Sequence, residues 1–434
     1  MAIAGPRPRQ ATVLRRLWRP ALIGYAALAA LVAWWTWRAL SDPLPWDTGL
    51  AYQAGRLAWA TGHPEHLATW NGTPLLVAVM ALLSRVVSAR GAADLVTALN
   101  VATAVGAVAL VLRRSRGVLP ARWRWVAALG LISFAPLISS VWFKQFNVIV
   151  LVLALAGFEL LRRGRVPAGA GLIGLSVALK PLAILLALIL LARRDTRRSG
   201  AFALAWIAGL SLAAQALLAA RAHDLGPLDP LTAIRNFLEK TKPVGVNFFF
   251  LCHPANYSPQ SLLCRVVGVH HWSFQRVAVG VFVLLLGVWV IDALRGRAAM
   301  SWEVFAFGCA LSVMLSPIAW SHYQVMLAPL FFLLFLRFVR DGAAVGAWAG
   351  LILALVLASL IWQPYGSIAN ALATVWQTAP RPREPTFLEG FSQFAQYLVV
   401  LTGVFWYVRH RAAAGQPGKS TPSSTGGVPR LPGP

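Results

Sequence analysis

Long apolar runs separated by short bursts of arginine and lysine constrain this sequence more than any other feature. Residues 21–37, 96–112, 201–220 and 277–291 are apolar runs that approach the ~20 helical residues needed to cross a hydrocarbon core. Hydrophobic residues make up 58% of the 434-residue chain and charged residues only 12%, whereas charged residues form about a quarter of soluble domains. The sequence therefore predicts an all-α, polytopic transmembrane helical bundle.

The net charge of +25 comes from basic bursts between the apolar runs. Nucleic-acid binding requires a basic face on a water-exposed domain, so we exclude nucleic acid and name membrane lipids as partners. Cytoplasmic loops carry an excess of lysine and arginine, which places the bursts on the inner side of a bacterial inner membrane. The bursts occupy 7–19, 113–124, 162–165, 193–198, 295–297, 337–340 and 409–411.

Placing every burst inside predicts about twelve spans with both termini cytoplasmic. The 27 residues of 166–192 lie between two bursts, so they must form two short helices that turn near Lys180 and Pro181. Residues 125–143 then lead outward and 146–161 return. If the stretch 74–87 were one more span, the basic burst 113–124 would lie outside. We therefore interpret 74–87 as re-entrant or interfacial.

The same topology predicts the domain organisation. A basic cytoplasmic N-terminus (1–20) precedes a transmembrane domain (21–411), and a tail (412–434) rich in Gly, Pro, Ser and Thr is expected to be disordered. Large periplasmic loops are expected at 41–73, 221–272 and 363–393. Because these loops hold most of the mass outside the spans, chemistry is expected on the outer side. Whether Cys252 and Cys264 in the second loop form a disulfide stays open.

Two acidic residues, Asp42 and Asp47, directly follow the first apolar run in a chain with only 14 carboxylates. The apolar spacing in 50–58 predicts a short amphipathic helix on the membrane surface. Asp47 is either a chemical group of the site or merely the N-cap residue of this helix.

Lysine at position 180 interrupts an otherwise apolar pair of helices. An intramembrane cation is costly unless it has a partner or serves a site, and the alternative is a lysine that snorkels to the interface. Lys144, Arg265 and Arg276 also lie near outer helix ends. Together these cations suit a phosphate, although each of the last three alone is more simply an interfacial anchor.

His322 lies at an outer turn beside Trp320 and Tyr323. It is equally suited to hydrogen-bonding a sugar, to moving a proton or to anchoring at the interface. The histidines show no zinc-site spacing, so we predict no metal and no cofactor. The sequence contains no phosphate-binding loop and no dinucleotide motif, which leaves nothing to bind a nucleotide sugar.

Several short segments follow one another in the order of a known family pattern. Lys144-Gln145-Phe146-Asn147 is similar to the element G-Q-x-N, and residues 316–322 are similar to S-P-I-S-W-x-H-H. Residues 162–165 are similar to R-R-G-R, and the following 170–174 and Lys180-Pro181 are similar to A-G with a further glycine and then K-P. Pro259-Gln260-Ser261-Leu262 with Arg265 is similar to N-Q-S-L with a following arginine. Asp47, Tyr52, Ala54, Gly55 and Gly62 follow the order of D-x-x-x-Y-x-x-A-G and a later glycine, with the spacing shifted by one residue. These segments resemble glycosyltransferase family 87, the polyprenol-phosphate-mannose-dependent mannosyltransferases of the GT-C membrane class. Lysine replaces the first glycine of G-Q-x-N, and 70–74 replaces a Tyr-Pro-Pro element.

The resemblance implies transfer of a hexose, mannose first, from a polyprenyl-phosphate donor to a lipid or glycan acceptor on the outer face, with inversion. An acceptor hydroxyl needs a base, for which Asp47 with help from His322 is the candidate, and the departing phosphate needs cations, for which Lys180, Arg265 and Lys144 are the candidates. The predicted substrate-binding residues are Asp42, Tyr52, Gln145, Asn147, Gln260 and Tyr323. The alternative function is a lipid-linked-sugar flippase or another secondary transporter.

Overall fold

The computed structural model describes residues 8–41, 46–64, 72–116, 119–132, 134–223, 301–314, 316 and 321–340, with isolated positions at 258, 277, 280, 281, 284 and 287. Every regular element in these residues is a helix, which confirms the all-α prediction for this part of the chain. In chain order the elements are α1 (Pro8–Ser41), α2 (Trp46–Thr61), α3 (Pro74–Val86), α4 (Ala89–Arg114), α5 (Ala121–Ile132), α6 (Ala135–Trp142), α7 (Asn147–Arg162), α8 (Val166–Leu179), the 3-10 helix η2 (Pro181–Ala183), α9 (Ile184–Ala192), α10 (Arg197–Ala222), α15 (Trp302–Met314), the 3-10 helix η5 (Ser321–Leu327) and α16 (Ala328–Arg340).

Two of the described helices, α4 and α10, are long and apolar enough to cross a membrane. The bent pair of α5 and α6 makes a third if it counts as one span. Leu95 and Leu99 on α4 and Trp206 and Leu212 on α10 remain exposed, as expected for side chains that face lipid. The chain is therefore a helical membrane protein. The predicted twelve spans and the placement of both termini inside are not confirmed by the described residues.

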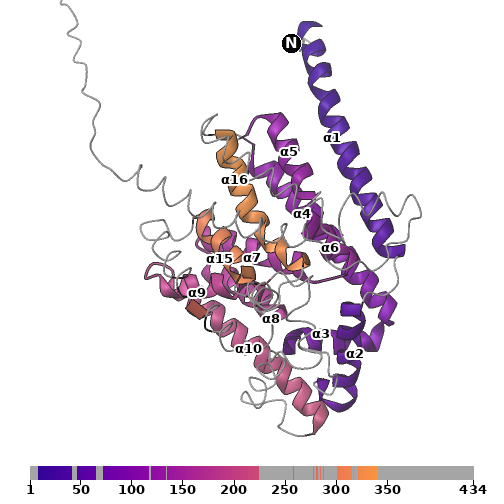
Figure 1. Cartoon of the computed structure of the whole chain (residues 1–434), viewed down its shortest axis with the longest axis vertical. Coiled ribbons are helices and arrows are strands. Elements are labelled where there is room, and N and C mark those ends of the chain that lie inside the picture. The colour runs from indigo at the N-terminus through magenta and orange to yellow at the C-terminus, as the bar shows by residue number, and fades with distance from the viewer. Residues whose placement is uncertain are drawn as a thin grey trace, which may run out of the picture.

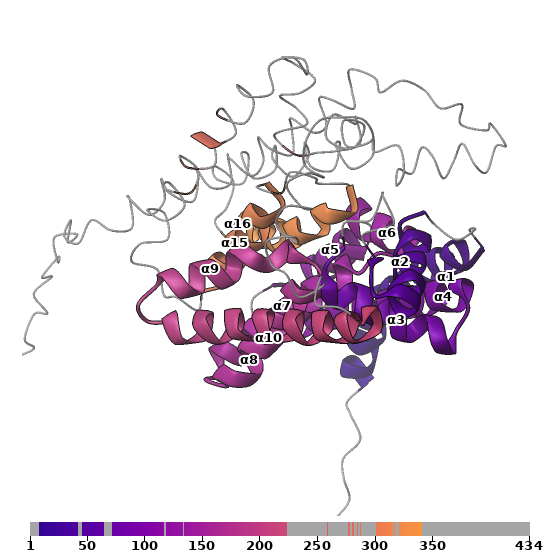
Figure 2. The ribbon, with the colours of Figure 1, turned by 90° about the horizontal axis from the view of Figure 1, so that it is seen from below.

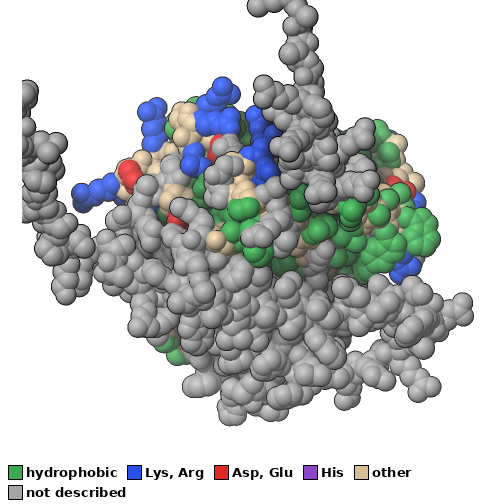
Figure 3. Space-filling model, turned by 90° about the horizontal axis from the view of Figure 1, so that it is seen from above, with side chains coloured by type: hydrophobic (Ala, Val, Ile, Leu, Met, Phe, Trp, Pro, Cys, Tyr) green, Lys and Arg blue, Asp and Glu red, His purple; other side chains and the backbone are tan. Residues whose placement is uncertain are grey.

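Charged and apolar side chains lie in different parts of the molecular surface. Seen from above Figure 1, lysine and arginine side chains gather at one margin of the described surface, whereas hydrophobic side chains gather at another (Figure 3). Such a division suits a protein whose apolar band contacts lipid and whose basic residues contact headgroups.

The predicted pair of short helices around Lys180 is confirmed. Helix α8 ends at Leu179, Lys180 has extended backbone, and η2 begins at Pro181 before the chain continues into α9. The cause is local, because proline has no N–H for the helix and its ring pushes the preceding residue into an extended conformation.

Helices α2 and α3 lie side by side near the C-terminal end of α10 (Figure 1). Helix α2 is amphipathic as predicted, with Ala51 and Ala58 buried and Arg56 exposed. A Cβ on Gly55 would lie 2.5 Å from the main chain of Met80, so the two helices meet at their backbones. Helix α3 has 13 residues and is ~20 Å long, shorter than a ~30 Å hydrocarbon core. The re-entrant or interfacial placement of 74–87 stays a prediction.

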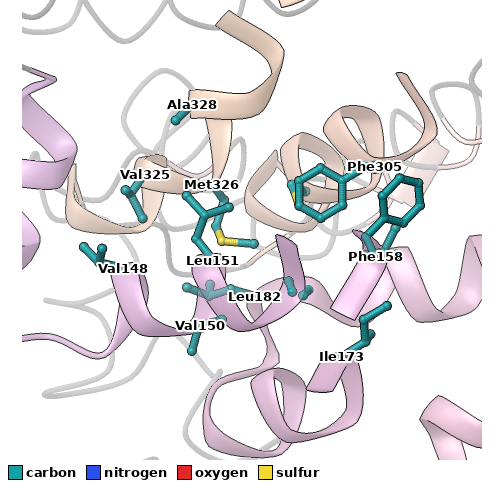
Figure 4. Packing of buried hydrophobic residues seen from close by; sticks show 14 of the residues in the cluster. Val148, Val150, Leu151, Phe158, Ile173, Leu182, Phe305, Val325, Met326 and Ala328 are labelled. Carbon is teal, nitrogen blue, oxygen red and sulfur yellow. The ribbon is translucent and has the colours of Figure 1, made fainter. Parts of the chain in front are cut away.

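The described core lies between α7, α8, η2, α15 and η5, with α10 along α8 and α9 (Figure 2). Helices α7 and α8 cross at two glycines, where a Cβ on Gly157 would lie 2.7 Å from the carbonyl oxygen of Gly169. Small residues let helices in membranes approach this closely. Phe158 of α7 packs against Phe305 of α15, and Met326 of η5 packs in the same cluster (Figure 4). This core supports the residues of the site described next.

Candidate functional site

The main chain of His322 joins the 3-10 helix η5 to α6 and to the start of α7, on both sides of the turn between them. Its carbonyl oxygen accepts hydrogen bonds from Ser140 Oγ at 3.0 Å and from Asn147 Nδ2 at 2.9 Å. The imidazole is buried, and its ring centroid lies 5.7 Å from that of Phe143. Because these contacts join residues about 175 positions apart, they bring two distant segments into one cluster.

Lys180 points into this cluster from the break between α8 and η2. Its Nζ donates a hydrogen bond to Gln145 Oε1 at 3.0 Å and lies 4.1 Å from the centroid of the Tyr323 ring. A cation over an aromatic face gains about 0.5–2 kcal/mol. Gln145 and Tyr323 are both neutral, so these two contacts orient the ammonium without adding a charge of their own. The Tyr323 ring in turn packs edge-on against His322, with centroids 4.9 Å apart.

Lys144 occupies a strained position in the same turn. Its φ is 52°, a left-handed conformation that costs an L-residue about 1–2 kcal/mol, and its side chain is only 1% exposed. Two donors from other helices hold the turn: Thr48 Oγ1 reaches the carbonyl oxygens of Phe143 and Lys144 at 3.1 and 3.2 Å, and Asn100 Nδ2 reaches the Gln145 carbonyl at 2.7 Å. Strain that the surroundings hold in place is typical of functional sites.

Three helices begin beside these lysines. Thr48, in the first turn of α2, contacts the Lys144 turn, and α7 starts at Asn147 within that turn. Thr73 caps α3 and donates to the carbonyl oxygen of Leu179 at 2.9 Å, one residue before Lys180. A helix N-terminus carries roughly half a positive charge and is a ready site for phosphate. The arrangement therefore brings the Lys144 turn, the ammonium of Lys180 and three helix N-termini close together.

The imidazole of His322 lies on η5, outside the candidate spans. Burial, followed by the positive charge of Lys180, lowers the pKa of His322 well below its ordinary value. The side chain is therefore neutral at physiological pH, where it accepts or donates hydrogen bonds but adds no charge. A positive charge in the site comes from Lys180, the charged group that helps to lower this pKa.

A family model described as glycosyltransferase family 87 matches residues 70–317, more than half of the chain. The chain belongs to glycosyltransferase family 87. It is thus a membrane glycosyltransferase, which uses a sugar donor and an acceptor. Neither the curated proteins nor the solved structures contain a match to this sequence.

The matched family 87 region contains Lys144, Gln145, Asn147 and Lys180. It does not contain Asp47 and Tyr52, which precede it, or His322 and Tyr323, which follow it. The structure nevertheless brings predicted residues from inside and outside this region together. The predicted site residues that form one cluster are Lys144, Gln145, Asn147, Lys180, His322 and Tyr323.

The other predicted residues of the family 87 site have different positions. Tyr52 is buried on α2, and its hydroxyl donates to the carbonyl oxygen of Val87 at 2.8 Å, at the junction of α3 and α4. Asp47 is the second residue of α2 rather than a residue preceding it, and its side chain lies outside the described part of the structure. Asp42, Gln260, Arg265, Arg276, Cys252 and Cys264 also lie outside the described residues.

Sequence reasoning missed the polar residues that position the site: Thr48, Thr73, Asn100 and Ser140. Each gives a hydrogen bond to a main-chain carbonyl of the cluster or its flanking turns. Asn100 offered a signal, because a buried amide within an apolar run is costly without a partner. The side-chain Oδ1 atoms of Asn100 and Asn147 are buried without a hydrogen-bond partner among the described residues, which is rare in folded proteins.

The predicted absence of a metal stays a prediction. Among the described residues no group of three or more His, Cys, Asp or Glu side chains is arranged to hold a metal ion.

The left-handed backbone at Lys144 makes a prediction that is independent of catalysis. Lys144→Gly should be more stable than Lys144→Ala by about 1 kcal/mol, because only glycine adopts this φ without strain. Thermal unfolding of the detergent-purified variants measures the difference. At exposed Gln53 inside α2 the order should reverse, with alanine about 1 kcal/mol better. An alanine variant at 144 as stable as the glycine variant would contradict the left-handed conformation.

Proposed function

We propose that this family 87 protein transfers a hexose, with mannose as the first candidate, from a polyprenyl-phosphate donor to a lipid or glycan acceptor. The reaction inverts the anomeric carbon and takes place on the outer face of a bacterial inner membrane. The observation that carries the proposal is the convergence of Lys144, Lys180 and the N-termini of α2, α3 and α7. This is a site for a phosphate.

The chemistry of the leaving group explains why such a site is needed. When the bond between the anomeric carbon and the phosphate oxygen breaks, a singly charged phosphodiester becomes a doubly charged phosphomonoester. Fixed positive groups stabilise this developing charge more strongly than the charge of the intact donor. Lys180, oriented by Gln145 and Tyr323, supplies one such group, and Lys144 and Arg265 are proposed to supply others. A lipid phosphate leaves as a stable anion, so the proposal includes no metal.

The acceptor hydroxyl must lose a proton as it attacks the anomeric carbon. We assign this proton to Asp47, because Thr48 holds the first turn of α2 against the Lys144 turn. His322 is neutral and buried in the same cluster, so it is suited to share the proton or to orient the hydroxyl. Asp42 is assigned to acceptor binding.

Polar groups around the cations are suited to the sugar hydroxyls. The Oδ1 of Asn147 is a buried acceptor without a partner among the described residues, and an added hydroxyl donor would satisfy it. We assign sugar recognition to Asn147, Gln145 and Tyr323, and keep Gln260 and Tyr52 as further proposed substrate contacts.

The outer location is supported by the course of α10. This helix has 26 residues and is therefore ~39 Å long, so its two ends reach opposite faces of a bilayer. Its first turn carries Arg197 and Arg198, part of a basic burst that favours the cytoplasm. The opposite end meets α2, where Gly62 lies against Ala222. Helix α2 thus joins the end of α10 that is expected outside.

A donor panel tests the function. The purified protein is incubated with radiolabelled polyprenyl-phosphate mannose, galactose or arabinose and a total lipid extract. We expect label to enter a new glycosidic product from the mannose donor and none from nucleotide sugars. Transfer from a nucleotide sugar alone would contradict the proposal, and donor movement across a bilayer without a new glycosidic bond would favour the flippase alternative.

A further inference from the structure

Two arginines from different helices stack on one tryptophan at the far end of α2. The guanidinium carbons of Arg221 on α10 and Arg85 on α3 lie 4.4 and 5.5 Å from the centroid of the Trp59 ring. We call these three residues the Trp59 patch. Both arginines are exposed and Trp59 is half-buried, so two positive charges share a small, accessible surface.

The patch is built rigidly rather than formed by loose surface side chains. Arg221 Nε donates to the carbonyl oxygen of Trp59 at 3.0 Å, which fixes one guanidinium. Beside it, Gly62 has a φ of 77° and touches Ala222 so closely that a Cβ would lie 2.3 Å from the alanine Cβ. The ends of α2 and α10 are therefore locked together.

No acid neutralises the Trp59 patch within the part of the chain that the structure describes. The ion pairs seen in the described residues lie elsewhere and include neither arginine of the patch. They join Arg90 to Asp94, Arg162 and Arg163 to Glu159, and Arg193 to Asp195. A guanidinium has five N–H donors in a planar fork, and Arg221 uses one of them on Trp59. The remaining donors match the oxygens of a phosphate, which guanidinium groups bind in pairs of parallel hydrogen bonds.

The position of the Trp59 patch in the membrane identifies the source of that phosphate. Arg221 lies at the end of α10 opposite the basic burst, the end that is expected outside. Tryptophan is enriched at the headgroup level of a bilayer. Guanidinium groups at that level would lie beside the phosphates of lipid headgroups.

We propose that the Trp59 patch binds the phosphate of an anionic phospholipid in the outer leaflet. The patch lies at the end of α3, and Thr73, which contacts the residue before Lys180, lies at its start. The length of α3, ~20 Å, separates the two phosphate sites. The bound lipid fastens the far ends of α2 and α3, whose near ends carry Thr48 and Thr73. This inference rests on the outer location of α2 that is part of the proposed function, but not on the proposed transfer reaction.

Native mass spectrometry of the full-length, detergent-purified protein tests the proposal, with phosphatidylglycerol and phosphatidylcholine of identical acyl chains as probes. We expect preferential retention of phosphatidylglycerol, weakened about fivefold by Arg85→Gln and about fivefold by Arg221→Gln. The matched control is Arg56→Gln, which removes an exposed arginine of α2 that is not part of the Trp59 patch; it should retain the lipid as the unaltered protein does. Unchanged circular dichroism shows that each variant is folded.

Equal retention of the two lipids, or no loss in either arginine variant, would overturn the proposal. Displacement of the lipid by inorganic phosphate, but not by chloride at equal ionic strength, would also overturn it, because the patch would then recognise a free phosphate. Affinity for polyprenyl phosphate is measured in parallel. This affinity should be unchanged in both arginine variants, because it depends on Lys180. A failure of the Trp59 patch and a failure of the Lys180 site are therefore distinguished.

Discussion

Asp47→Asn should express, insert and bind the donor normally while its transfer rate falls about 100- to 10,000-fold. The amide keeps the size of the carboxylate and most of its hydrogen bonds but cannot take the proton of the acceptor hydroxyl. Single-turnover transfer from radiolabelled polyprenyl-phosphate mannose measures the loss.

The matched control is Asp42→Asn, which changes a neighbouring acid in the same way and should have a much milder effect. A second variant, Thr48→Val, keeps the carboxylate but removes the hydroxyl that holds α2 against the Lys144 turn. It should slow transfer less than Asp47→Asn does, because the base is misplaced rather than lost. Near-normal turnover by Asp47→Asn would refute the assignment and leave Asp47 as an acid that stabilises the start of α2.

Lys180→Met should weaken binding of polyprenyl-phosphate mannose by about 10- to 100-fold. The estimate follows from a hydrogen bond to a charged group, which contributes about 1.5–3 kcal/mol. Methionine keeps much of the lysine stem against Tyr323 but removes the ammonium. Because the charge on the phosphate increases during transfer, the rate with bound donor should also fall. Titration with labelled donor measures affinity, and single-turnover kinetics measure the rate.

Two variants separate the charge of Lys180 from its position. Lys180→Arg keeps a cation and should bind donor better than Lys180→Met. Gln145→Leu keeps the ammonium but removes the oxygen that orients it, and it should have an intermediate affinity. Arg56→Met, which removes an exposed cation of α2, should change nothing. If Lys180→Met binds donor as the unaltered protein does, Lys180 is a lysine that snorkels to the interface.

The parts of the fold that follow from local rules were predictable. The break at Lys180 follows from Pro181 and from the short distance between two basic bursts. The amphipathic helix α2 follows from apolar spacing alone. Helix α4 covers the predicted run 96–112, and α10 covers 201–220.

The count of spans was harder to predict because several apolar helices are short or broken. Helices α7, α8 and α9 have 16, 14 and 9 residues, fewer than the ~20 that a straight span needs. Helices α5 and α6 bend by 42° at their junction. The pattern of apolar runs and basic bursts gives the number of apolar segments. It does not show where each helix ends or bends.

The candidate site was predictable as a set of residue types but not as an arrangement. Thr48 contacts carbonyl groups 95 and 96 residues away, and no local pattern carries that information. The left-handed conformation of Lys144 was also not predictable, because the surrounding turn is held by residues from other helices. The sequence showed lysine where the similar family element has glycine, yet only the backbone explains why glycine suits that position.

Phosphate recognition is the central claim, and one comparison of affinities tests it most directly. Polyprenyl phosphate and the uncharged polyprenol of the same length differ only in the group that the lysines and helix N-termini are proposed to hold. Equilibrium binding to the unaltered protein should favour polyprenyl phosphate by at least about 100-fold, as expected for two hydrogen bonds to charged groups. Equal affinity for the two lipids would contradict the account, because the site would then bind the polyprenyl chain and not the phosphate.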